Sequence, residues 1–85
     1  MVEPSELQPG MPVLTHRGEK LGVIVEVTDE ELIVGRGRLL WRKDYAVPLE
    51  DIREVIADEV HLLHGPDSLL SGPREIPRSG RRTTH

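Results

Sequence analysis

The chain has 85 residues, of which 31% are charged, and it contains no cysteine. This length allows one small domain, and the lack of cysteine excludes disulfide bonds and thiolate metal sites. No stretch of about 18 consecutive apolar residues occurs, which argues against a transmembrane helix and membrane insertion. A soluble protein of the reducing cytoplasm is therefore expected.

The charges divide the chain into two parts. Residues 1–64 hold thirteen acidic and seven basic side chains, whereas residues 65–85 hold four arginines and two acids. A domain that binds nucleic acid is usually basic, because neutralised phosphates supply most of its affinity. The acidic body therefore argues against nucleic-acid binding by the body itself, and the tail adds a weak basic footprint.

Short apolar runs separated by turn residues begin near residue 10, as in small β-barrels. They predict five to six short strands, drawn from the segments 11–15, 21–27, 31–34, 45–47, 53–56 and 59–63. The segment 39–42 is either a further strand or an irregular loop. A single helical turn is expected at 49–52, because that segment is too short for a stable helix. A helix over 49–64 is the main alternative, since its apolar spacing also fits a helical period.

The two ends of the chain differ from the middle. Residues 1–9 contain two prolines and predict a flexible leader. Residues 65–85 are rich in proline, glycine and arginine, and they bury too little apolar surface to offset the cost of ordering. We therefore expect one domain over 10–64, followed by a disordered tail.

Three segments within this domain form a pattern: the turn and strand at 17–24 (RGEKLGVI), the element at 45–52 (YAVPLEDI) and the closing strand at 58–62 (DEVHL). Together these segments resemble the PRC-barrel-like family of small β-barrels. The family includes the reaction-centre H subunit and the C-terminal domain of a ribosome maturation factor, and many of its members stand alone. The resemblance implies an all-β, SH3-like antiparallel barrel with an adaptor role. Gly22 suits the pattern because glycine allows close approach of two backbones.

A second resemblance is to the glycine-turn motif of ribosome-associated SH3-like barrels. It rests on five small or apolar positions: Val13, Gly18, Gly22, Val23 and Val27. This motif is degenerate, so the first resemblance is preferred.

No arrangement of residues predicts catalysis, a bound cofactor or a metal. All four serines lie in the leader or the tail. The acidic residues of the body outside the first strands are expected to be solvated on turns: Asp44, Glu50, Asp51, Asp58 and Glu59. His61 and His64 lie three positions apart, which suits a helix face but sends strand side chains to opposite faces. The segment Gly35-Arg36-Gly37 lacks the third glycine and the βαβ unit of a dinucleotide-binding loop.

Binding of a partner macromolecule is the remaining function that the sequence suggests. Four basic residues and the only tryptophan lie within eight positions: Arg36, Arg38, Trp41, Arg42 and Lys43. Arginine and tryptophan are enriched at protein-interface hot spots, and both also stack on nucleic-acid bases. The alternative is that Trp41 fills the small core and the arginine stems cover its edge.

These observations favour a non-enzymatic barrel that binds a protein partner as an adaptor. A homodimer is also expected to be favourable, because pairing through an exposed edge would extend a modest core. An RNA- or ribosome-associated factor that uses residues 36–43 and the arginine tail is the alternative. A small enzyme or ligand-binding protein is the third reading, and a bound small molecule would reveal it.

Overall fold

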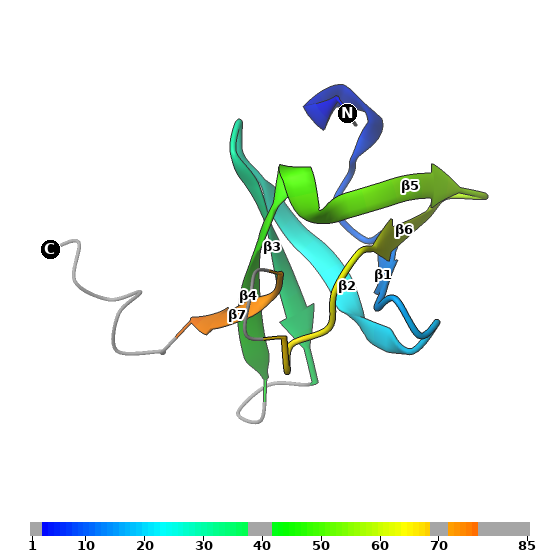
Figure 1. Cartoon of the computed structure of the whole chain (residues 1–85). Helices are drawn as coiled ribbons and strands as arrows, with labels where there is room; N and C mark the ends of the chain where they lie inside the picture. The colour runs from blue at the N-terminus through cyan, green and yellow to red at the C-terminus, as the bar shows by residue number, and fades with distance from the viewer. Residues whose placement is uncertain (1–2, 38–41, 69–71, 77–85) are drawn as a thin grey trace, which may run out of the picture.

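The computed structural model describes residues 3–37, 42–68 and 72–76. Its regular elements are seven strands and two single turns of 3₁₀ helix (Figure 1). In chain order they are η1 (Pro4–Glu6), β1 (Pro12–Leu14), β2 (Lys20–Val27), β3 (Glu31–Arg36), β4 (Lys43–Pro48), η3 (Leu49–Asp51), β5 (Ile52–Ile56), β6 (Glu59–Leu62) and β7 (Arg74–Ile76). The fold is all-β and barrel-like, as the spacing of turns predicts.

One sheet contains all seven strands, in the order β5-β6-β1-β2-β3-β4-β7. Strands β2, β3 and β4 form an antiparallel meander, and β5 and β6 form a hairpin. The two units meet at β1, where Val13 lies opposite Val60 and β1 runs parallel to β6. The expected barrel was antiparallel throughout, so this pair corrects the prediction. β1 pairs antiparallel with β2 through its other edge, so it joins the meander and the hairpin in one continuous sheet.

Aliphatic side chains fill the interior. Those with 0% exposure are Val13, Leu32, Val34, Val47, Val60 and Leu62. Leu21 and Ile24 of β2 are exposed by only 1%, although three positions separate them. Register shifts on both sides of β2 interrupt the strict alternation and allow both residues to face the core. Tyr45 joins the same cluster, so the single tyrosine is a core residue.

The hairpin over 52–62 replaces the helix that was weighed for 49–64. The helical turn expected at 49–52 is present as η3. Ala57 and Asp58 form the two-residue turn between β5 and β6, with φ angles of 52° and 64°. Such angles are typical of a type I′ hairpin turn, whose twist matches that of the flanking strands. Pairing of β6 with β1 therefore outweighs the helical spacing of the apolar residues.

The ordered region extends beyond the predicted domain limits at both ends. Leu7, within the predicted leader, is 5% exposed and belongs to the core. The η1 turn places it there, with Leu7 N–H donating to Pro4 O at 3.1 Å. Beyond residue 64, β7 adds a seventh strand by pairing with β4, and Pro73 before it is buried. Residues 69–71 and 77–85 of the predicted tail, and 39–41 of the uncertain segment 39–42, lie outside the described residues.

Candidate interaction surface at the end of β3 and β4

The β3–β4 ladder brings basic side chains together at one end of the sheet. It begins with Glu31 opposite Pro48 and ends with Arg36 opposite Lys43. Arg36 and Lys43 are both exposed, and the part of the chain that the structure describes forms no ion pair with either. Like charges directly opposite on neighbouring strands repel each other. An acidic group bound between them would remove this repulsion.

Arg42 has a different environment from its two basic neighbours. Its Nε donates to Asp44 Oδ1 at 2.7 Å, and its Nη2 lies 3.4 Å from Asp44 Oδ2. The Asp44 side chain is 7% exposed and that of Arg42 is 39% exposed, so the arginine neutralises a buried carboxylate. Its guanidinium crosses Gly35, where an added Cβ would lie 3.1 Å from Nε. A side chain at position 35 would therefore come into tight contact with the Arg42 side chain.

Three of the five predicted patch residues therefore lie together. We call Arg36, Arg42 and Lys43 the basic end. Arg38 and Trp41 lie outside the described residues. The predicted strand boundary also shifts, because Gly35 and Arg36 continue β3 where a break was expected.

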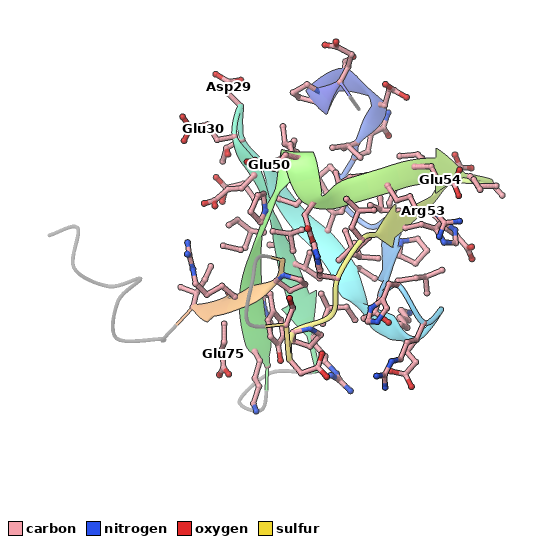
Figure 2. The ribbon with its side chains drawn as sticks, viewed as in Figure 1. Asp29, Glu30, Glu50, Arg53, Glu54 and Glu75 are labelled. Carbon is pink, nitrogen blue, oxygen red and sulfur yellow. The ribbon has the colours of Figure 1, made fainter. Side chains whose placement is uncertain are left out.

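Acidic side chains gather at the opposite end of the same strands. Thr28 organises the β2–β3 turn by accepting hydrogen bonds on Oγ1 from the N–H groups of Glu30 and Glu31. Glu30 O in turn accepts a hydrogen bond from Leu49 N–H at 3.0 Å, which joins this turn to η3. Figure 2 shows Asp29, Glu30 and Glu50 close together there. The β3–β4 pair thus separates acidic and basic groups by its own length, about 17 Å at 3.3 Å per residue.

Two acids that sequence analysis placed in solvent are buried instead. Asp44 is 6% exposed and Asp51 is 2% exposed. His64 Nδ1 lies 2.5 Å from Asp51 Oδ1, and Leu63 N–H donates to Asp51 O at 2.8 Å. Gly72 covers this pair, because an added Cβ there would lie 2.7 Å from the Cβ of His64. The pair therefore anchors the segment that leads to β7.

Nothing in the sequence indicated that Asp51 would be buried. Asp51 and His64 are thirteen residues apart, and only the folded path of the chain brings them together. Asp44 had a weak signal, since it directly precedes a buried strand segment and follows a basic residue at position 42. A buried carboxylate requires a partner of this kind.

The described residues contain no group of three or more histidine, cysteine or acidic side chains arranged to hold a metal ion. His61 lies near Glu59, with 3.6 Å between Nε2 and Oε1, whereas His64 contacts Asp51. The two histidines thus have separate carboxylate neighbours.

The described part of the chain also has no helix with the length and hydropathy of a membrane span. Its only helical elements are the two three-residue 3₁₀ turns. Comparison of the chain with protein-family models, with curated proteins and with solved structures finds no match.

Proposed function

We propose that this barrel is a non-enzymatic protein-interaction module whose basic end binds an acidic surface of a partner protein. The observation that carries the proposal is the terminal ladder pair, in which Arg36 and Lys43 lie opposite each other, both exposed. Arg38 and Trp41 belong to the same connection in the sequence. Arginine and tryptophan are enriched at interface hot spots, so the composition of residues 36–43 favours a protein contact.

We further propose that the chain is a PRC-barrel-like protein of the cytoplasm. Support comes from where the three resembling segments fall in the fold. The segment 17–24 enters β2, 45–52 covers most of β4 and all of η3, and 58–62 contains β6. Gly22 also packs directly against the carbonyl group of Gly35, a close approach that a residue without a Cβ allows. The cysteine-free composition fits a reducing compartment.

RNA or the ribosome is the competing partner of the same surface. The basic end alone suits phosphate groups as well as carboxylates. The acidic end lies on the same two strands, however, and repels a polyanion that extends along the sheet. Protein binding is therefore the better-supported function, and salt dependence separates the two. Phosphate contacts weaken steeply as salt rises.

The test is capture of partners from native lysate with the wild-type chain and two charge-reversed variants. Arg36→Glu/Lys43→Glu changes the basic end. Arg17→Glu/Lys20→Glu makes the same change in charge at another exposed site, formed by the β1–β2 turn and the first residue of β2. We expect the first variant to lose a protein partner that the second variant retains, with and without nuclease.

Two outcomes would contradict the proposal. Equal loss of partners in both variants would assign the effect to net charge. Loss of all partners after nuclease treatment would favour the RNA reading. Circular dichroism of both variants checks that the sheet is intact.

A further inference from the structure

Strand β5 has an open outer edge. It stands first in the sheet order and, among residues 3–37, 42–68 and 72–76, pairs with β6 alone. An edge strand presents unpaired main-chain donors and acceptors that can template a further strand. Figure 1 shows β5 and the turn after it projecting from the side of the molecule opposite β7. The other strands of the sheet therefore lie on the β6 side of β5, and no described strand lies on its outer side.

A bulge divides β5 into two parts. The register with β6 shifts between Ile52 and Glu54, which leaves Arg53 as an extra residue. Ile52 and Val55 both pack toward the core, while the side chains of Arg53 and Glu54 form an exposed ion pair at 3.1 Å. Figure 2 shows these two charged residues on β5, away from Glu75 of β7. Residues 54–56 are thus the projecting part of the strand.

The projecting part carries an exposed apolar side chain. Ile56 is 50% exposed, and the other large exposed hydrophobic side chain of the described residues is Leu63, at 45%. Ile56 lies opposite Glu59 at the turn end of the hairpin, whereas Leu63 follows the other end of β6. Only Ile56 therefore combines exposed apolar area with an unpaired strand edge.

We propose that residues 54–56 pair antiparallel with β5 of a second copy of this chain, across a two-fold axis at Val55. In a two-fold antiparallel pair, side chains that lie directly opposite each other point to the same face of the joined sheet. Each residue therefore lies opposite its own copy or opposite a residue an even number of positions away in the sequence. Centring on Glu54 would place two carboxylates opposite each other. Centring on Ile56 would place Glu54 opposite Asp58 of the second copy, again two acids.

Centring on Val55 avoids both repulsions. Val55 then meets its own copy, and Ile56 lies beside the aliphatic part of Glu54 of the second copy. The extra residue Arg53 comes close to the turn that carries Asp58 of the second copy, which brings opposite charges together. Cross-strand apolar and opposite-charge pairs stabilise a sheet, whereas like charges directly opposite destabilise it. The charges of β5 thus select one register for the β5–β5 pair. The basic end lies elsewhere in the fold and does not contribute to this pairing.

Sedimentation measurements over a range of concentrations test the pairing. We expect the wild-type chain to form dimers, and Ile56→Glu to weaken dimerisation by about tenfold or more, since it removes the burial of one large apolar side chain from each of the two copies. Leu63→Glu is the matched control and should leave dimerisation unchanged. A wild-type chain that stays monomeric, or equal effects of the two variants, would overturn the inference.

Cross-linking tests the register independently. Because the chain has no cysteine, Val55→Cys introduces a single thiol that lies opposite its own copy. Glu75→Cys on the other edge of the sheet is the control. We expect disulfide-linked dimers of Val55→Cys to form at least about tenfold faster than those of Glu75→Cys, since a disulfide requires Cβ atoms that face each other at short distance. Equal rates would refute the two-fold axis at Val55.

Discussion

Gly22→Ala should disrupt the contact between β2 and β3. An added Cβ at Gly22 would overlap the carbonyl oxygen of Gly35, lie 2.9 Å from its carbonyl carbon and 3.0 Å from Val34 Cγ1. Overpacking typically costs about 1–3 kcal/mol, and the upper part of that range applies where the obstacle is main chain. Replacing a strand glycine returns about 0.5–1 kcal/mol of conformational entropy. We therefore expect a net loss of about 2 kcal/mol in the free energy of unfolding.

Thermal unfolding followed by circular dichroism measures this loss. For a domain of this size, about 1 kcal/mol corresponds to about 4–8 °C, so Tm should fall by about 8–16 °C. Gly35→Ala is the matched control, because the nearest atoms to its added Cβ, Val25 Cγ2 and Arg42 Nε, belong to side chains that can move. The loss in the free energy of unfolding for Gly35→Ala should be less than half of that for Gly22→Ala. A Gly22→Ala variant as stable as the wild type would refute the close approach of the two strands.

Three further substitutions test other features of the fold. Ala57→Asn with Asp58→Gly places favoured residues at the two positive-φ positions and should stabilise the chain by about 1 kcal/mol in urea unfolding; a loss of stability would contradict the turn geometry. Asp44→Ala removes the carboxylate that binds the guanidinium of Arg42 and should cost about 1–3 kcal/mol in the same assay, whereas an unchanged midpoint would show that the pair is not formed. Gly72→Ala, at φ 116° and in a crowded position, should speed hydrogen exchange of the β4 amides that face β7, while exchange in β2 stays unchanged as the control.

Local pattern was sufficient to predict most strands. The segments at 21–27 and 59–63 show alternating apolar side chains or adjoin turn residues, and both signals come from neighbouring residues alone. Both segments are strands whose bounds lie within one residue of the prediction. The single helical turn was predictable because Pro48 precedes it and the segment 49–52 is too short for a stable helix by itself. These features do not depend on distant parts of the chain.

Features that depend on distant contacts were missed. Strand β7 has three residues with no apolar alternation, and it exists only because β4 offers an edge. The burial of Asp51 depends on His64 and on the glycine that covers both. Leu7 appeared to be part of a loose leader until the η1 turn placed it in the core. In the predicted patch, spacing placed the basic residues together, but it could not show that Arg42 is already engaged by Asp44.

The parallel contact between β1 and β6 also governs the order in which the barrel can assemble. Val13 and Val60 are direct neighbours in the sheet, yet 46 residues of chain separate them. The meander of β2, β3 and β4 needs only local turns, so it can form while the C-terminal part is still inside the ribosome. The core cannot close until β6 has emerged from the ribosome. The entropy of closing the 46-residue loop between Val13 and Val60 is lost before the β1–β6 contacts that offset it can form. We therefore expect closure of the β1–β6 pair to limit the folding rate, and the nascent meander to expose the apolar face that the β5–β6 hairpin later covers.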